Sequence, residues 1–239
     1  FYTGIYGSYI DNGITTKTYI DSQNRNTSQF INIDGMVTMN GYMNFGWQYK
    51  KLHLRPSIYL NFGRNGSFSI QNDKKLKNES VNLSTTFSLN HDWKDVMSTR
   101  YKATINYNVG WSDIPGYQTQ RVLTHSHGIN TTFYLPKKFE LGSDCDFNFQ
   151  PKNSSFNTNF NIITWNAWLQ RKFLKNDQGI IMLSVNDILN NNTGYRRNVF
   201  GNTVSETNRL VIKRYWLLTF TWNFSKNGNG GFAEAALAV

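Results

Sequence analysis

The sequence predicts an all-β fold, an antiparallel up-and-down β-barrel that crosses a membrane with its strands. Large apolar residues recur at every second position in several segments, which places them on one face of a β-strand. Aromatic residues make up 15% of the chain and gather at the ends of these segments, where a bilayer would meet them with its headgroups. Short turns alternate with long polar stretches, an asymmetry typical of outer-membrane barrels.

The N-terminal half contains six expected strands. The alternation is already present in residues 1–9, and between 52 and 70 apolar residues such as Leu54 and Leu60 alternate with polar neighbours. It is strictest in 78–91 and 97–112, where almost every second residue is apolar or aromatic. The strands expected in this half are 1–10, 12–21, 30–49, 52–70, 78–91 and 97–112.

The C-terminal half continues the pattern and raises the total to about ten or eleven strands. Its last segment is the clearest, because an apolar residue occupies every second position from Trp216 to Phe224. We expect the apolar set to face lipid, with Val109 near mid-bilayer, and the polar set to face the barrel interior. The strands expected in this half are 119–135, 138–150, 159–173, 179–189 and 208–224.

The connections are expected to be of two kinds. Aromatic residues flank the short turns, so a membrane girdle is predicted there, formed by Trp47, Trp93, Phe139, Phe173 and Trp222. The short turns are 49–51, 92–95, 136–138 and 175–179. The long polar stretches are 21–28, 71–78, 112–118, 151–158 and 190–208.

The net charge of +10 raises the question of an anionic partner. The cations lie singly or beside short turns, so they form no single basic face, and a nucleic-acid partner is not expected. Membrane lipid, the phosphates of lipopolysaccharide or an anionic cargo are the expected counterparts. The chain has no run of about 18 apolar residues, so no transmembrane helix is predicted.

No constellation predicts catalysis, a cofactor or a metal centre. Cys145 is the only cysteine, which excludes an intrachain disulfide. His125 and His127 share one strand face and could hold a metal with a third ligand, but they are more simply explained as lumen or loop residues. Asp144 and Asp146 also share a face, which fits a water-filled interior better than acid–base catalysis. We therefore expect a protein that is not an enzyme.

Ligand contacts are expected on the long loops and on the polar inner faces. These faces contain cations, amides and a phenol that could hydrogen-bond a passing solute. The residues predicted to contact a ligand are His53, Arg55, Tyr59, Arg100, Lys102, Asn106 and Asn108.

Four segments near the C-terminus carry a resemblance to a known family. In order they are NIITWNAWLQRKFLKN (161–176), IMLSVNDILNN (181–191), YRRN (195–198) and RYWLLTFTWNF (214–224). Their order and spacing resemble the C-terminal end of TonB-dependent receptors of Bacteroidetes, in particular the outer-membrane β-barrel family. The resemblance is specific over about residues 160–224, and residues 30–150 share only the general pattern.

The resemblance implies a 22-stranded barrel in the cell outer membrane, of which residues 1–224 would be one segment. It implies energised import of a bulky nutrient such as a siderophore, glycan or peptide. Implied partners are the rest of the barrel, a plug domain, TonB and a surface lipoprotein. The terminal aromatics Trp222 and Phe224 would serve as an assembly signal. Residues 225–239, a Gly/Asn linker with an Ala-rich tail, have no expected role.

Two other interpretations remain open. The first is a plug-less outer-membrane barrel that acts as an anchor, adhesin or assembly partner. The second is a soluble β-sandwich, which would not need aromatic girdles. The pairing of the last strand distinguishes a plug-less barrel from a segment of a transporter barrel. A segment of a larger barrel should pair 208–224 with 179–189 on one side only, whereas a small closed barrel would also pair it with 1–10.

Overall fold

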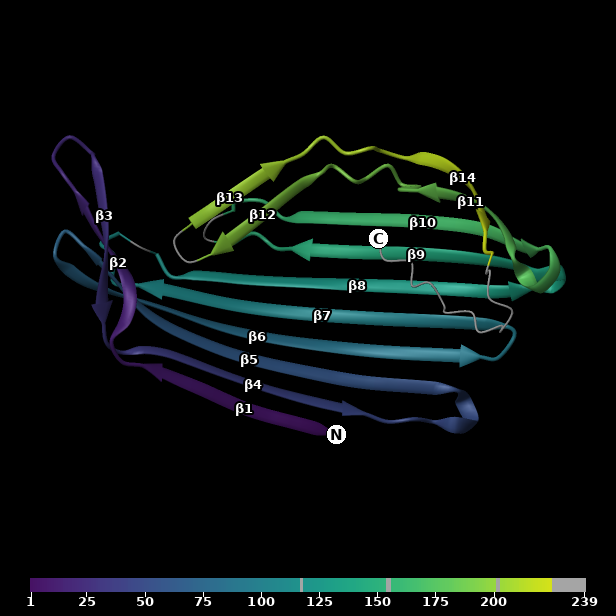
Figure 1. Cartoon of the computed structure of the whole chain (residues 1–239), viewed down its shortest axis with the longest axis horizontal. Coiled ribbons are helices and arrows are strands. Elements are labelled where there is room, and N and C mark those ends of the chain that lie inside the picture. The colour runs from purple at the N-terminus through teal and green to yellow at the C-terminus, as the bar shows by residue number, and fades with distance from the viewer. Residues whose placement is uncertain (117, 154–155, 201–202, 225–239) are drawn as a thin grey trace.

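The computed structural model describes residues 1–116, 118–153, 156–200 and 203–224, and it is all-β and antiparallel, as the sequence predicts (Figure 1). Three single turns of 3-10 helix accompany the strands. The strands are β1 (Tyr2–Ile10), β2 (Gly13–Ile20), β3 (Asn26–Ile33), β4 (Met36–Gly46), β5 (Leu54–Gln71), β6 (Lys74–Trp93), β7 (Met97–Ser112), β8 (Gln120–Leu135), β9 (Phe139–Gln150), β10 (Phe160–Phe173), β11 (Gly179–Asn186), β12 (Tyr195–Phe200), β13 (Thr203–Asn208) and β14 (Tyr215–Trp222). The 3-10 turns are η1 (Lys50–Leu52), η2 (Pro136–Lys138) and η3 (Lys175–Asp177).

One sheet of 12 strands dominates the structure, and neighbouring strands follow the chain up and down from β4 to β11. The order along the sheet is β1-β4-β5-β6-β7-β8-β9-β10-β11-β14. β2 and β3 form a hairpin that joins β5 by a short parallel pairing at Lys17 and Thr18. β12 and β13 form a separate hairpin.

The sheet is open, not closed. β14 pairs with β11 along its full length, and β1 pairs with β4. Within the described residues, β1 and β14 lie at opposite ends of the strand order and do not pair with each other. The small closed barrel that would favour an anchor is therefore not formed by these strands.

The two ends of the sheet differ in their connections (Figure 1). η1, η2, η3 and the turn after Trp93 close neighbouring strands at one end. The hairpins β2–β3 and β12–β13 lie at the other end, together with the loops that follow β7 and β9. These are called here the turn end and the loop end. The four predicted short turns thus lie at the turn end and the longer connections at the loop end, which also contains the short turn between β5 and β6.

Some predicted boundaries are wrong. Residues 30–49 are not one strand, because Gly35 adopts φ 94° and turns the chain between β3 and β4. Residues 71–78 are not a long loop. Asn72 and Asp73 both have positive φ and form a two-residue turn, so β5 and β6 continue to the tip of their hairpin.

Two further corrections concern the C-terminal part. The predicted loop 190–208 contains the β12–β13 hairpin, and the last strand begins at Tyr215 instead of residue 208. A buried turn after β11 explains why the β11–β14 pair is shorter than predicted. The Asp187 carboxylate, 5% exposed, accepts hydrogen bonds from the backbone of Asn191 (2.9 Å) and Asn192 (3.0 Å), and this turn ends β11.

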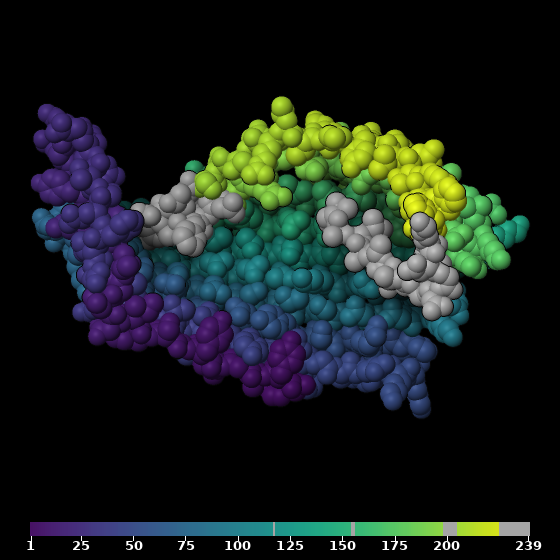
Figure 2. Space-filling model, viewed as in Figure 1, coloured from purple at the N-terminus to yellow at the C-terminus, as the bar shows by residue number. Residues whose placement is uncertain are grey.

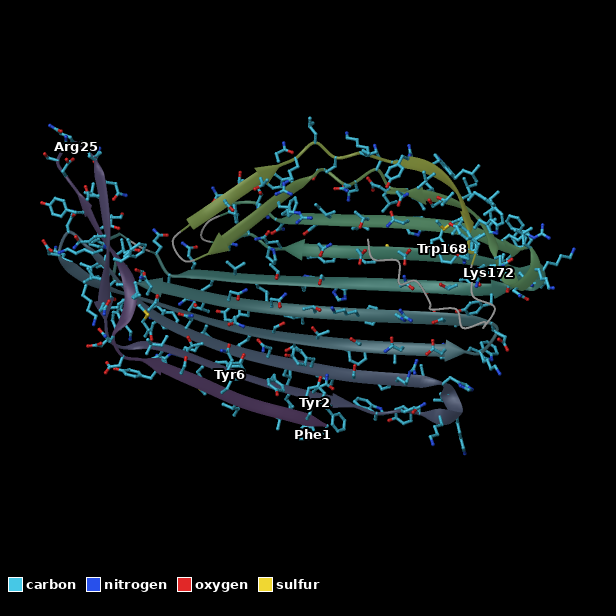
Figure 3. The ribbon with its side chains drawn as sticks, in the orientation of Figure 1. Phe1, Tyr2, Tyr6, Arg25, Trp168 and Lys172 are labelled. Atoms are coloured by element: carbon cyan, nitrogen blue, oxygen red, sulfur yellow. The ribbon has the colours of Figure 1, made fainter. Side chains whose placement is uncertain are left out.

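The two faces of the sheet have opposite chemistry, as the alternation predicts. One row across four strands reads Asn61, Ser84, Asn106 and Thr124. The adjacent row, on the other face, reads Phe62, Leu83, Tyr107 and Leu123. The sheet is curved, and its polar face is the hollow one, on which Trp168 and Lys172 lie (Figures 2 and 3).

Among the described residues, no second layer covers the apolar face. Leu83 is 46% exposed, Ile105 52% and Leu218 68%. The buried side chains Ile33, Leu76, Val122 and Phe156 lie at or near the loop end. Among the described residues, no helix has the length and hydropathy to cross a membrane.

Candidate functional site

The hollow face of the sheet is lined by polar side chains that hydrogen-bond from strand to strand. Ser84 donates to Asn106 (2.7 Å), and Asn106 donates to Thr124 (3.5 Å). Thr86 and Thr104 share a hydrogen bond of 3.1 Å. Such cross-strand pairs hold hydroxyls and amides in fixed orientations. The face therefore offers an ordered array of donors and acceptors to a solute in the hollow.

Charged residues lie on this face in two opposed groups. Arg100 and Lys102 belong to β7, and Asp144 and Asp146 belong to β9. β8 lies between them and contributes Asn130 and Gly128 at the same levels. Two strand spacings separate the groups by about 10 Å. A cationic side and an anionic side thus face the same hollow.

The two cations of this group have no protein partner among the described residues. Arg100 and Lys102 are exposed, and neither side chain takes part in an ion pair or hydrogen bond there. Asp144 does have a partner, because Asn130 donates to its carboxylate. Unpaired guanidinium and ammonium groups remain available to an anionic ligand.

The other predicted ligand-contacting residues divide into two sets. Tyr59, Asn106 and Asn108 lie on the same hollow face, since they share rows with Thr86, Ser84 and Asn82. Arg55 also lies on this face, near the turn end, where it forms an ion pair with Asp92. His53 lies outside the strands, because it ends η1 in a left-handed conformation (φ 52°), and its contact with a ligand stays a prediction.

The five predicted girdle residues lie together at the turn end. Trp93, Phe173 and Trp222 are the last residues of β6, β10 and β14, and Phe139 is the first residue of β9. Trp47 follows β4, with its ring 5.2 Å from that of Phe45. Trp93 and Trp222 are 54% and 59% exposed. That this ring of aromatics marks a membrane boundary stays a prediction.

The terminal aromatics predicted as an assembly signal contact each other. The rings of Trp222 and Phe224 are 6.0 Å apart, at the end of the strand that edges the sheet. Their position leaves one side of β14 open to a further strand. Their role in assembly stays a prediction.

The histidine pair lies on the apolar face, so its expected place in the lumen or a loop is wrong. His125 and His127 alternate with Leu123 and Ile129 on that side of β8. His125 Nδ1 lies 3.3 Å from His127 Nε2, and His125 stacks on Phe149 at 4.7 Å. Within the described residues, no group of three His, Cys, Asp or Glu could hold a metal ion.

Sequence reasoning missed a buried arginine at the loop end. Arg197 of β12 is 6% exposed and donates to the carbonyl oxygens of Thr158 (2.9 Å) and Gln150 (3.3 Å). Its guanidinium lies over the rings of Phe156 (4.5 Å) and Phe160 (5.0 Å). These contacts fasten the β12–β13 hairpin to the β9–β10 connection. The only sequence signal was its place in the YRRN segment.

The side chain of Tyr195 also helps to hold the β12–β13 hairpin against the β9–β10 connection. Tyr195 begins β12, and its ring lies 5.0 Å from that of Phe160. Desolvation and a hydrogen bond to Glu206 raise the pKa of the Tyr195 hydroxyl. The phenol therefore stays neutral at ordinary pH and acts as a hydrogen-bond donor to the carboxylate.

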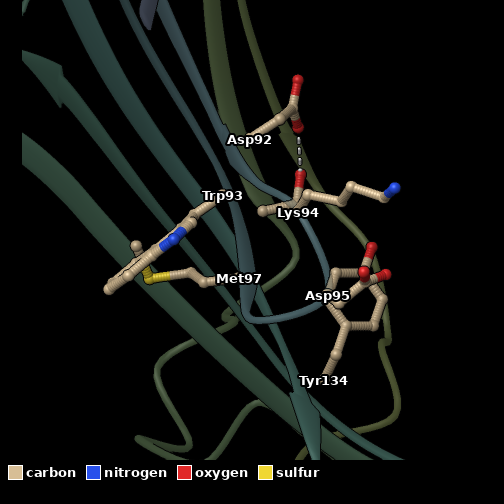
Figure 4. Close-up of a pocket in the computed structure, with 7 residues that line it drawn as sticks. Asp92, Trp93, Lys94, Asp95, Met97 and Tyr134 are labelled. Atoms are coloured by element: carbon tan, nitrogen blue, oxygen red, sulfur yellow. Dashed lines mark hydrogen bonds between the residues drawn. The ribbon is translucent and has the colours of Figure 1, made fainter. Parts of the chain in front are cut away.

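A shallow pocket lies at the turn end, beneath the connection between β6 and β7 (Figure 4). Trp93, Met97 and Tyr134 supply its apolar wall. Ser98 donates to Asp92 at its edge (2.8 Å). Because it lies on an open turn, outside the hollow that contains the free cations, it is not assigned to ligand binding.

No family model, curated protein or solved structure matches this chain.

Proposed function

We propose that this chain forms part of the barrel wall of a TonB-dependent outer-membrane transporter that imports a bulky nutrient such as a siderophore, glycan or peptide. The observation that carries the proposal is the division of one curved sheet into an exposed apolar convex face and a polar hollow face. If water lay on both sides of the sheet, exposure of the apolar convex face would be unfavourable. If lipid lay against the convex face and water filled the hollow, both faces would be in a favourable environment.

The height of the apolar band supports a membrane setting. On β6 the apolar face runs from Leu83 to Trp93, which is eleven residues. At ~3.3 Å per residue and a tilt of ~45°, such a segment rises about 25 Å, the height of the apolar band of outer-membrane barrels. Beyond it, at the loop end, the same face carries Arg64, Glu79 and Arg121.

The two free sheet edges support membership of a larger barrel. Backbone N–H and C=O groups without partners cost several kcal/mol each in hydrocarbon. In the described structure β1 and β14 each have one partner strand. In a membrane both outer edges must therefore meet further strands, which we assign to the rest of the barrel. A plug domain, TonB and a surface lipoprotein are the further partners of this proposal.

The hollow face would form part of the path of the imported solute. Its free cations, Arg100 and Lys102, would meet anionic groups of a nutrient. Asn106, Asn108 and Tyr59 would supply neutral hydrogen bonds beside them. Weak, distributed contacts suit a pathway, because a solute must leave as readily as it enters.

Uptake in the native host tests the proposal. Deleting the gene should abolish uptake of one nutrient from a panel of iron–siderophore complexes, oligosaccharides and peptides, and a protonophore should have the same effect on wild-type cells. Arg100→Gln combined with Lys102→Gln should lower that uptake several-fold with unchanged amounts of protein in the outer membrane. Lys74→Gln combined with Lys75→Gln, which removes two charges from the exposed loop end, is the matched control.

Two outcomes would overturn the proposal. Recovery of the wild-type protein in the soluble fraction would remove the membrane setting. A deletion strain that imports every nutrient on the panel but loses surface attachment would replace transport by the anchor or adhesin function.

A further inference from the structure

A second shallow pocket lies on the convex face, where the apolar band meets the loop end. Its lining combines two kinds of side chain, apolar or aromatic ones from β7 and β8 and cationic ones from β8 and the loop after β9. The lining residues are Tyr107, Thr119, Arg121, Leu123, Pro151, Lys152 and Asn153. The pocket is therefore amphipathic.

The two kinds of side chain lie at different levels along the strands. Tyr107 and Leu123 are opposite each other in the register and are 36% and 43% exposed on the apolar face. Arg121 is two rows nearer the loop end on the same face, opposite Val109. Lys152 lies in the loop beyond β9. Apolar surface thus lies toward the middle of the band, and positive charge lies above it.

The positive charge of this pocket has no ion-pair partner among the described residues, unlike the neighbouring cations at the loop end. Arg64 and Lys77 both pair with Glu79, at 2.6 Å and 3.2 Å. Arg121 and Lys152 are exposed, and among the described residues neither side chain has an ion pair or hydrogen bond. The pocket therefore lacks the anion that the adjacent cations already have.

The described residues around Lys152 are held by hydrogen bonds of their own. The Lys152 backbone N–H donates to the Asn159 side chain (2.9 Å), and the Asn153 N–H donates to the Phe156 carbonyl oxygen (2.9 Å). Phe156 is 4% exposed beneath the Arg197 guanidinium. Backbone that is already hydrogen-bonded at Lys152 and Asn153 lowers the entropic cost of binding a ligand there.

We propose that this pocket binds a phosphorylated lipid of the leaflet at the loop end, an inference that rests on the membrane setting of the proposed function. Arg121 and Lys152 would bind the phosphate, since basic side chains at a membrane surface attract anionic headgroups. An acyl chain would lie along Leu123 and Tyr107, whose position suits an interfacial aromatic. A free phosphate would use the cations alone.

Native mass spectrometry of the whole transporter, purified from outer membranes in detergent, tests the proposal. Three probes are titrated: lipid A, dephosphorylated lipid A and inorganic phosphate. Wild-type protein should retain one lipid A molecule and discriminate against the dephosphorylated form. Arg121→Gln combined with Lys152→Gln should weaken lipid A binding about 30-fold, and Leu123→Ser should weaken it several-fold. Lys74→Gln combined with Lys75→Gln is the control of equal charge and should change it less than three-fold.

The remaining outcomes are distinguishable. Equal retention of both lipid A forms would overturn the phosphate contact, and equal affinity for inorganic phosphate with no effect of Leu123→Ser would overturn the lipid. If the double variant does not insert, Lys152→Gln alone should give about a five-fold loss. Wild-type protein that inserts but retains no lipid A overturns only this inference, whereas wild-type protein that does not insert overturns the proposed function.

Discussion

The Tyr101 hydroxyl and His127 Nδ1 lie 2.8 Å apart on the apolar face of the sheet. His127 Nε2 in turn lies 3.3 Å from His125 Nδ1. One tautomer satisfies both contacts, with the phenol donating to Nδ1 and Nε2–H donating to His125. These three polar side chains therefore satisfy one another on the apolar face, and in a membrane this pairing would lower the cost of placing them against lipid.

We expect Tyr101→Phe to lower the free energy of unfolding by about 1 kcal/mol, because it leaves His127 Nδ1 without its donor. Replacing all three residues, as Tyr101→Phe, His125→Leu and His127→Leu, should be neutral or stabilising, since no polar group is then left unpaired. Urea unfolding in phospholipid vesicles measures both. A triple variant less stable than the single one would show that the histidines contact something other than lipid.

The cost of a charge should depend on its height on the convex face. Val109 is level with Arg64 and Arg121, toward the loop end, so in a membrane it would lie nearer the boundary than the mid-bilayer position expected from the sequence. Ala103, level with Phe87, lies nearer the middle of the band. Ala103→Arg should therefore cost about 2–4 kcal/mol and Val109→Arg about 0–1 kcal/mol.

Asn106→Arg, on the hollow face, is the control for these two variants and should cost little, since its side chain would meet water. All three are compared by unfolding in vesicles of one lipid composition. Equal costs at positions 103 and 106 would contradict the assignment of the convex face to lipid.

Removing the Arg197 guanidinium should loosen the loop end without unfolding the sheet. Arg197→Met keeps apolar contact with Phe156 and Phe160 but leaves the Thr158 and Gln150 carbonyl oxygens without a donor. We expect a local loss of about 1–3 kcal/mol. Hydrogen exchange should accelerate in β12 and in residues 156–159 and stay unchanged in β6 and β7. The exposed neighbour Arg196, changed to Gln, should have no such effect.

The turn after β11 should depend on the Asp187 carboxylate. Asp187→Ala removes the acceptors for the Asn191 and Asn192 N–H groups. It also places alanine, whose side chain forms no hydrogen bond, at a positive φ of 51°. We expect a loss of about 2 kcal/mol for Ala and a smaller loss for Asn, which keeps one acceptor and tolerates this conformation. Equilibrium unfolding ranks the two variants, and equal losses would assign the effect to charge.

Much of the sheet is predictable because the side chains of each face largely share one polarity. A strand such as β7 begins and ends where predicted, at Met97 and Ser112, since the alternation stops when the chain leaves the sheet. The free cations Arg100 and Lys102 are also found on the predicted polar side. The same parity rule places His125 with Leu123, and only the polarity of imidazole suggested otherwise.

The wrongly predicted turns and the missed buried arginine depend on local backbone conformation or long-range packing, which the alternation of apolar and polar residues does not report. The Asn72–Asp73 turn depends on positive φ at two residues, and a polar run containing them resembles a loop. His53 belongs to a turn because the chain reverses at η1, inside an uninterrupted alternating pattern. Arg197 contacts groups up to 47 residues away in the sequence, so its burial depends on packing that no local pattern describes.

The β2–β3 hairpin stands apart from the rest of the sheet, with Arg25 at its tip (Figures 1 and 3). Its two strands satisfy each other's backbone, and its pairing with β5 is confined to Lys17 and Thr18. Changes in its length or composition therefore disturb few other residues. We expect this hairpin to diverge fastest among relatives of this protein, so that a variable surface can evolve on a sheet whose own sequence is constrained by the alternation of its two faces.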